Sequence, residues 1–315
     1  MRKNYIIAAS LQLFCLVVLL VSVSNAGSMN SDLASGDNGT RFDFDGDGKA
    51  DIGVLRNGTW YLLQTRNGFA GIQFGLQGDI TTPGDFNGDG ISDIAVFRSG
   101  FWYILSSNGG FTSLQFGSPG DIPVWADYDG DGKDDIAVFR PSNGTWYRLN
   151  SSNNQFVAFK WGTTGDKPQV GDFDGDGRAD YAVFRPSNGF WYILRSSNNS
   201  FSQTHFGAAT DIPTPADYDG DGKTDISVFR PSAISWYRIN SSTNQPFGIQ
   251  FGIDGQDIPA VADYDGDGKA DLAVYNPPRA SFSIRGSRDN VNKPPMRWGM
   301  STDKPINVSP AYQYQ

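Results

Sequence analysis

Short apolar segments alternate with polar turns from about residue 37 to residue 302. In one representative stretch, apolar segments at 121–126, 136–139, 145–149 and 156–161 are separated by turns rich in Gly, Pro, Asn, Asp and Ser. The apolar segments are rich in Val, Ile, Phe, Trp and Tyr, which is typical of β-strands. No helical period is visible after the first 26 residues, so the pattern predicts an all-β protein.

An aspartate-rich loop of nine residues recurs six times. The copies begin at Asp43, Asp85, Asp127, Asp172, Asp217 and Asp263, at intervals of 42, 42, 45, 45 and 46 residues. A fixed period of about 40–50 residues marks a repeat protein. Because four short strands in each period are the content of one propeller blade, we expect a β-propeller of four-stranded blades. A straight solenoid is the alternative, but it would need atypical capping repeats, which the sequence does not show.

The repeats also predict the domain boundaries. A flexible segment at 27–36 precedes a propeller at 37–302, whose six repeats lie at about 37–78, 79–120, 121–165, 166–210, 211–256 and 257–302. Residues 303–315 repeat the opening of a further unit without its aspartate loop. We therefore expect six blades and a C-terminal strand that closes the ring against the first blade. A seventh, incomplete blade is the alternative.

The loop has the composition of a calcium site. Acidic or amide side chains at positions 1, 3, 5 and 9 can converge because glycines at positions 4 and 6 allow a sharp turn. Position 7 carries a side chain unsuited to binding calcium, so its backbone carbonyl is the expected donor. The predicted ligands are Asp43, Asp45, Asp47, Lys49, Asp51, Asp85, Asn87, Asp89, Ile91, Asp93, Asp127, Asp129, Asp131, Lys133, Asp135, Asp172, Asp174, Asp176, Arg178, Asp180, Asp217, Asp219, Asp221, Lys223, Asp225, Asp263, Asp265, Asp267, Lys269 and Asp271.

A metal-free turn is the alternative reading, because turns favour Asp and Gly. Four carboxylates within nine residues would repel one another, however, unless a cation lay between them. Magnesium is disfavoured because it retains its waters and demands octahedral geometry, and zinc because His205 is the only histidine. We expect up to six calcium ions with a structural role.

The N-terminus has the layout of a secretory signal peptide over residues 1–26. Arg2 and Lys3 precede an apolar stretch, and Ala26 ends a small-residue cleavage signal. An uncleaved membrane anchor and a lipid anchor at Cys15 are the alternatives. We expect an exported, extracellular protein, with the bacterial surface or periplasm possible, and no membrane span after cleavage. Cys15 is the only cysteine, so bound ions rather than disulfides would supply rigidity.

Charge and the remaining acidic residues argue against two functional classes. The formal net charge is −9 and no basic stripe is visible, which disfavours nucleic-acid binding. All 34 acidic residues are aspartates. Apart from the predicted calcium ligands and the strand-opening aspartates, only Asp32, Asp134, Asp254 and Asp289 remain, singly and in dissimilar contexts. Hydrolysis by paired carboxylates is therefore not indicated, and we expect no enzymatic activity.

An aromatic–glycine pair precedes each turn that leads to a further loop or to the C-terminal tail. The pairs are Phe74-Gly75, Phe116-Gly117, Trp161-Gly162, Phe206-Gly207, Phe251-Gly252 and Trp298-Gly299. This order resembles the FG-GAP, or VCBS, repeats of bacterial secreted proteins and of the integrin α-subunit propeller, over nearly all of residues 37–302. The resemblance implies calcium between the first and second strands of a blade and a role in adhesion or ligand binding. Integrin propellers have seven blades and bind few calcium ions, so six loops depart from them.

Two further sets of positions recur. An arginine ends most second strands and an aspartate starts each first strand, which predicts structural ion pairs such as Arg140–Asp121; a ring of arginines for an anionic ligand is the alternative. Trp-Tyr pairs such as Trp146-Tyr147 open the third strands. Because adjacent strand residues face opposite sides, one ring of each pair should pack between blades while the other reaches the surface.

These features predict a monomeric binding module with a protein or cell-surface ligand. The alternative is a propeller lectin that binds glycans through repeated aromatic pockets.

Overall fold

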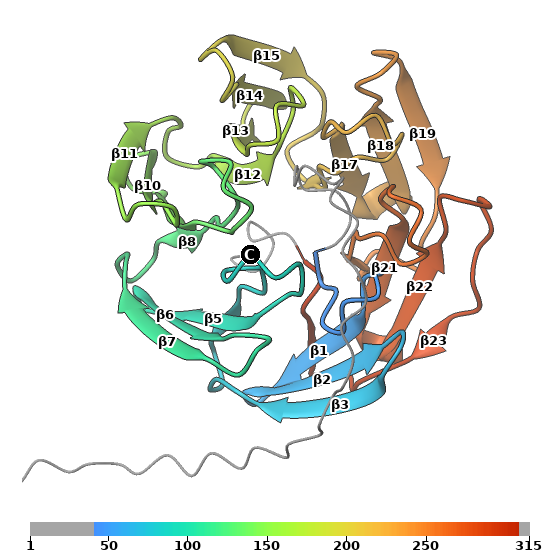
Figure 1. Ribbon diagram of the computed structural model, residues 1–315. Helices are drawn as coiled ribbons and strands as arrows, with labels where there is room; N and C mark the ends of the chain where they lie inside the picture. Colours follow the sequence, from blue (N-terminus) through green and yellow to red (C-terminus); the bar gives the residue numbers. More distant parts are fainter. Residues whose placement is uncertain (1–40, 309–315) are drawn as a thin grey trace, which may run out of the picture. The chain divides into compact units, whose positions relative to one another are not determined.

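The computed structural model describes residues 41–308, which form six four-stranded antiparallel sheets arranged as a β-propeller (Figure 1). Within this range there is no α-helix, and two 3-10 turns occur at Pro231–Ala233 and Pro277–Arg279. The prediction of an all-β, six-bladed propeller is confirmed, and the seven-bladed alternative is wrong. The predicted signal peptide (1–26) and flexible segment (27–36) lie outside the described residues.

Each blade consists of four strands, which are named in their spatial order. Blade 1 comprises β24 (Lys304–Pro305), β1 (Ile52–Arg56), β2 (Thr59–Gln64) and β3 (Gly68–Gln73). Blade 2 comprises β4 (Ile80–Thr81), β5 (Ile94–Arg98), β6 (Phe101–Leu105) and β7 (Phe111–Gln115), and blade 3 comprises β8 (Ile122–Pro123), β9 (Ile136–Arg140), β10 (Thr145–Leu149) and β11 (Phe156–Lys160). Blade 4 comprises β12 (Lys167–Gly171), β13 (Asp180–Arg185), β14 (Phe190–Leu194) and β15 (Phe201–His205). Blade 5 comprises β16 (Ile212–Pro213), β17 (Ile226–Arg230), β18 (Ser235–Ile239) and β19 (Pro246–Gln250), and blade 6 comprises β20 (Ile258–Pro259), β21 (Leu272–Asn276), β22 (Ser281–Arg285) and β23 (Met296–Arg297).

The hydrophobic core lies between the blades. One cluster joins Trp146 of blade 3 to Val183 of blade 4, and corresponding clusters join the other neighbouring pairs. The tryptophan that opens each third strand is buried in the first five blades: Trp60, Trp102, Trp146, Trp191 and Trp236. Each of these indoles donates a hydrogen bond to the carbonyl of the aromatic–glycine pair in its own blade, as Trp146 Nε1 does to Trp161 O at 2.7 Å. These tryptophans are therefore inter-blade core residues.

One strand of the first blade comes from the C-terminal part of the chain. Strand β24 pairs with β1, where Lys304 lies opposite Leu55. Ile306, which follows β24, is fully buried, and a Cβ on Gly53 would lie 2.3 Å from its Cδ1 atom. A glycine at position 53 therefore lets the closing segment lie directly against the second strand.

The predicted ion pairs are present at the end of the second strand remote from the aspartate loop. Both oxygens of buried Asp121 accept hydrogen bonds from Arg140 at 2.8 Å. The Arg140 guanidinium also lies 4.6 Å from the ring centre of Tyr147, the tyrosine of the Trp-Tyr pair. The same arrangement joins Arg56 to Asp303, Arg98 to Asp79, Arg185 to Asp166 and Arg230 to Asp211, and Asn276 replaces the arginine beside Asp257. The prediction of structural ion pairs is confirmed.

Replacing Arg140 with alanine should lower the free energy of unfolding by about 3 kcal/mol, because the buried Asp121 carboxylate would lose its cation. Arg140→Asn should cost less, because Asn276 already satisfies Asp257 in blade 6. Urea unfolding at fixed calcium measures both changes. Equal stability of the wild-type protein and Arg140→Ala would contradict a stabilising role for the pair.

Candidate metal sites

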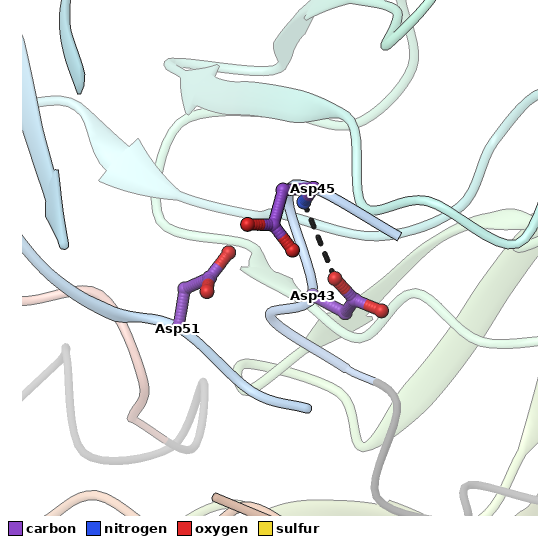
Figure 2. Close-up of side chains that lie close together, drawn as sticks. All are labelled: Asp43, Asp45 and Asp51. Carbon is purple, nitrogen blue, oxygen red and sulfur yellow. Dashed lines mark hydrogen bonds between the residues drawn. The ribbon is translucent and has the colours of Figure 1, made fainter. Parts of the chain in front are cut away.

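Each aspartate loop connects the first and second strands of its blade and brings three of its carboxylates together. In five loops the carboxylate oxygens of positions 1, 3 and 9 lie within 4.8 Å of one another. Figure 2 shows Asp43, Asp45 and Asp51 turned toward a common space. The other groups are Asp127 with Asp129 and Asp135, Asp172 with Asp174 and Asp180, Asp217 with Asp219 and Asp225, and Asp263 with Asp265 and Asp271.

Backbone amides orient the carboxylates at positions 1 and 9. In the third loop, Asp127 accepts hydrogen bonds from the amides of Gly130 at 2.6 Å and Gly132 at 2.8 Å. Both glycines have positive φ angles, so the turn depends on residues without a side chain. Asp135 accepts from Tyr128 N within the loop and from Ser151 N in the turn between the third and fourth strands. The carboxylate at position 9 therefore joins the loop to that turn.

The carboxylate at position 3 supplies the test of whether a cation fits. In the five groups, one of its oxygens is buried and has no hydrogen-bond partner among the described residues: Asp45, Asp129, Asp174, Asp219 and Asp265. A buried charged oxygen without a partner costs several kcal/mol unless a cation compensates it. Converging carboxylate oxygens are the donors that calcium prefers, so the residues present fit a calcium ion.

The second loop differs from the other five. Asn87 stands at position 3, and its Nδ2 atom donates hydrogen bonds to Asp93 Oδ1 at 3.1 Å and to Ser107 Oγ at 2.9 Å. The amide thus directs its nitrogen, not its oxygen, at the position-9 carboxylate. A cation in this loop would require the amide to turn over, so this is the least favourable of the six predicted sites.

Position 5 lies apart from the three converging carboxylates. Asp131 Oδ1 accepts from Lys133 N at 3.0 Å and from Ser151 Oγ at 2.8 Å. Each loop repeats this pattern, with Asp47, Asp89, Asp176, Asp221 and Asp267 accepting from Thr65, Ser107, Ser196, Ser241 and Ser287. These hydroxyl residues are not among the predicted site residues, although their recurrence in all six repeats is a sequence signal that identifies them.

The side chain at position 7 contacts the neighbouring loop. A Cβ on Gly130 would lie 3.1 Å from Arg178 Cγ, which belongs to position 7 of the next blade. Lys133, Lys223, Lys269 and Lys49 cover Gly88, Gly175, Gly220 and Gly266 in the same way, and Ile91 covers Gly46. Glycine at position 4 is thus required by the neighbour as well as by the turn. Carbonyl coordination at position 7 stays a prediction.

Hydrogen bonds link all six loops into a closed ring. The amide at position 8 of each loop donates to the carbonyl at position 1 of the preceding loop, as Ala179 N does to Asp127 O at 2.7 Å. The other bonds run from Ser92 to Asp43, Asp134 to Asp85, Thr224 to Asp172, Ala270 to Asp217 and Ala50 to Asp263. The residue that offers its carboxylate to a cation therefore holds the neighbouring loop through its backbone.

This ring predicts that neighbouring loops are energetically coupled. Asp129→Ala combined with Asp174→Ala disables adjacent loops, whereas Asp129→Ala combined with Asp265→Ala disables loops three blades apart. The adjacent pair should destabilise by less than the sum of its single variants, by about 0.5 kcal/mol or more, and the distant pair should be additive within about 0.5 kcal/mol. Chemical unfolding in calcium measures the three single variants and the two double variants. Additivity in both pairs would show that the ring does not transmit binding.

Burial raises the pKa of the carboxylate at position 9 in every loop. Desolvation brings the pKa to about 7 for Asp51 and Asp180. For Asp93, Asp135, Asp225 and Asp271 it brings the pKa to about 6. Desolvation also raises the pKa of five position-1 carboxylates, against opposing amide hydrogen bonds: Asp43, Asp127, Asp172, Asp217 and Asp263. Without a cation, these carboxylates therefore take up protons at a higher pH than an ordinary aspartate does.

The pKa values predict a pH-dependent effect of calcium on stability. A folded-state pKa above the unfolded value of 3.8 means that the metal-free protein loses stability as pH rises from about 4 to about 7. Calcium requires ionised ligands, so its stabilising effect should be complete above pH 7 and fade as pH falls through 6. Melting of metal-free and calcium-loaded protein between pH 5 and pH 8 tests this. A melting difference independent of pH would contradict it.

Comparison with known families agrees with this geometry. Residues 43–96, 85–138, 127–183, 172–228 and 217–274 match the FG-GAP-like repeat. The chain belongs to the FG-GAP-like repeat family. Each match runs from one aspartate loop into the second strand of the next blade, so the family pattern covers the loops and their connections. No curated protein has a significantly similar sequence.

Solved structures share the propeller fold with this FG-GAP repeat chain. A streptogramin B lyase matches with a TM-score of 0.56 at 12% identity, covering 86% of each chain. An Agrocybe aegerita lectin specific for non-reducing terminal N-acetylglucosamine matches with a TM-score of 0.56 at 16% identity, over 83% of this chain and 78% of the lectin. A chain of a nidogen–laminin complex has a TM-score of 0.56 at 12% identity, over 79% and 93%. Within residues 41–308, no helix has the length and apolarity needed to cross a membrane.

Proposed function

We propose that this FG-GAP repeat protein is an exported, non-catalytic binding module whose blades are stabilised by calcium. The observation that carries the metal assignment is the buried, unpartnered oxygen at position 3, beside two further carboxylates, in five loops. Calcium would be held by the aspartates at positions 1, 3 and 9, with further oxygens at positions 5 and 7. It would act as a cross-link in a chain whose only cysteine is Cys15.

The remaining acidic residues support a non-catalytic role. Asp134 accepts a hydrogen bond from the amide of Asp85, Asp254 accepts from Asn276, and Asp289 pairs with Lys293. Each has a local structural contact, and the Asn276 amide that Asp254 shares with Asp257 stands where the other blades have the arginine of a structural ion pair. His205 packs against the ring of Phe190 at 4.9 Å. The likeness to a lyase is limited to the fold, because the sequences are 12% identical.

We propose export, to the medium or the bacterial surface, on the basis of the leader-like residues 1–26. A monomer that binds a protein or another cell-surface ligand fits this location. Binding residues commonly lie on loops that a rigid scaffold positions, and the propeller provides such a scaffold.

Glycan binding is the second candidate, and the exposed aromatic side chains favour it. Phenylalanines of the outer strands are exposed in five blades: Phe69, Phe111, Phe156, Phe201 and Phe247. Phe156 lies against Tyr147 of its own blade and Phe116 of the preceding blade. A lectin of similar fold recognises N-acetylglucosamine, which makes a sugar a reasonable ligand to test.

Binding of labelled protein to bacterial cells and to a glycan array, with and without calcium, tests these roles. Saturable binding to cells with no binding to the array would support a protein ligand. Trp146 is buried, so replacing it would disturb the core. Phe156→Ala is the better test of sugar binding, because this ring is 58% exposed. Absence of saturable binding to cells and glycans, by protein that is folded and calcium-loaded, would contradict the binding role.

A further inference from the structure

We propose that the cleft between blades 5 and 6 binds an acidic sugar, meaning one pyranose unit that carries a carboxylate. This inference rests on the proposed binding role and names a ligand class for it. The cleft has a volume of about 250 Å³ and opens beside the aspartate loop of blade 5. Tyr218, Arg238 and Phe247 line it from blade 5, and Lys269, Leu272 and Arg285 line it from blade 6.

The cleft gathers three cations that have no acidic partner. Among residues 41–308, no carboxylate forms an ion pair with Arg238, Lys269 or Arg285, whereas most second-strand arginines are paired with aspartates. Asp219 is the only acidic residue in the lining, and it is one of the predicted calcium ligands. A bound cation would offset its charge. The cleft is therefore positive in a chain whose formal net charge is −9.

Aromatic rings rather than a carboxylate hold the Arg238 guanidinium. It lies 5.1 Å from the ring centre of Tyr218 and 4.6 Å from that of Phe247. Its Nε atom donates to Asn240 Oδ1 at 2.8 Å, while its two terminal nitrogens have no hydrogen-bond partner among the described residues. Stacked guanidinium groups are restricted in position, so these nitrogens are preorganised to bind a carboxylate through two hydrogen bonds.

The equivalent junction between blades 3 and 4 is filled. Tyr181 occupies the position of Leu272, and its ring lies 5.3 Å from both Tyr128 and Trp146 and 5.5 Å from Phe159. Arg148, the equivalent of Arg238, lies over Tyr128 and Tyr181 and donates to Tyr128 O. The smaller Leu272 side chain thus leaves space between blades 5 and 6 that a tyrosine fills elsewhere in the same protein.

The rest of the lining favours a sugar over a simple anion. Phe247, which is 45% exposed, and Ile249 form an apolar wall on the blade 5 side. On the blade 6 side, Asn290 offers its amide, and the Ser287 hydroxyl, which donates its proton to Asp267, offers an acceptor oxygen. A ring with one apolar face, several hydroxyl groups and one carboxylate matches this combination. The volume lies below the range of about 300–1,000 Å³ typical of sites for drug-sized ligands, and so suits a single ring.

Calorimetric titration of the full chain with glucuronate, in saturating calcium, tests the assignment. Glucose, acetate and phosphate serve as comparison ligands. We expect saturable glucuronate binding that is weaker by about tenfold or more in Arg238→Gln and Arg285→Gln, because each loses a charge-assisted hydrogen bond. Leu272→Tyr should abolish binding by filling the cleft. The matched control Arg148→Gln, at the filled junction, should bind as the wild-type protein does.

No saturable binding of glucuronate, or undiminished binding by a folded Leu272→Tyr variant, would overturn the site. If glucose bound as tightly as glucuronate, the ligand would not need a carboxylate. If acetate or phosphate bound as tightly as glucuronate, the ligand would not need to be a sugar. Melting temperature with and without calcium is measured on the same samples. If calcium stabilises the protein but glucuronate does not bind, the proposed sugar site is wrong and the calcium assignment still holds.

Discussion

Removing calcium is expected to lower the melting temperature by about 15–25 °C. Extracellular calcium sites have a Kd of about 10⁻⁴–10⁻³ M, so a tenfold excess of free calcium stabilises the folded state by about 1.4 kcal/mol per site. Five sites with three converging carboxylates each would contribute about 7 kcal/mol, and each kcal/mol corresponds to about 2–4 °C in a domain of this size. Differential scanning calorimetry of chelator-treated and calcium-loaded protein measures the shift.

The reason for so large an effect is the state of the loops without metal. Each of the five groups holds three carboxylates within 4.8 Å, and one oxygen in each group has no partner. In the absence of a cation, the protein must take up protons or open the loop, and either response weakens the contact between neighbouring loops.

Two controls separate calcium from general ionic effects. Magnesium at the same concentration should restore little stability, because it demands six oxygens in octahedral geometry. Asp129→Ala should reduce the number of bound calcium ions by about one, whereas Asp289→Ala removes an exposed aspartate outside the loops and should leave the count unchanged. Unchanged melting after chelation, together with no bound calcium by elemental analysis, would contradict the proposed role of the metal.

Features set by nearby residues could be predicted from the sequence. Positions 1, 3 and 9 fall within nine residues, so the turn required by the two glycines largely determines their convergence. The Arg140–Asp121 pair followed from the same reasoning, because two antiparallel strands that leave one loop must bring their far ends together. The fixed period then predicted the propeller, since each repeat carried the same four strands.

Contacts between blades could not be predicted in the same way. The bond from Ala179 N to Asp127 O joins two backbone groups. Almost every residue type has these groups, so the amino-acid sequence does not reveal the bond. The contact of Arg178 with Gly130 depends on the distance between neighbouring loops, which the period does not give. The sequence therefore predicts only a role for the backbone carbonyl at position 7, whereas the side chain at this position also covers the neighbouring loop.

Differences between the repeats identify the contact that closes the ring, which the shared pattern alone does not. Position 53 is glycine, whereas its equivalents in the other blades are Ala95, Ala137, Ala182, Ser227 and Ala273. Across from it, Ile306 is larger than Val124, its equivalent in blade 3. This exchange of volume between two strands far apart in the chain marks the closing contact, and comparison of the repeats with one another could have found it.

A chain that ends at Thr302 is expected to lose about 6 kcal/mol or more of unfolding free energy. It would lack β24, the buried Ile306 side chain and the Asp303 carboxylate that pairs with Arg56. A buried isoleucine contributes about 2–5 kcal/mol and a buried ion pair about 3–5 kcal/mol. Urea unfolding in calcium measures the loss, and a truncated chain as stable as the full one would contradict closure by this segment.

Point variants distinguish loss of closure from truncation itself. Gly53→Ala should destabilise the full chain, because the new methyl group would collide with Ile306 and Leu62. Combining it with Ile306→Val copies the Ala137–Val124 pairing of blade 3 and should recover much of the lost stability. Lys304→Ala alters an exposed side chain in the same strand and should have little effect. Strand β24 completes blade 1, and Ile306 shares a core cluster with residues of blades 1 and 2. Recovery of stability by the double variant would therefore show that ring closure depends on the fit between positions 53 and 306.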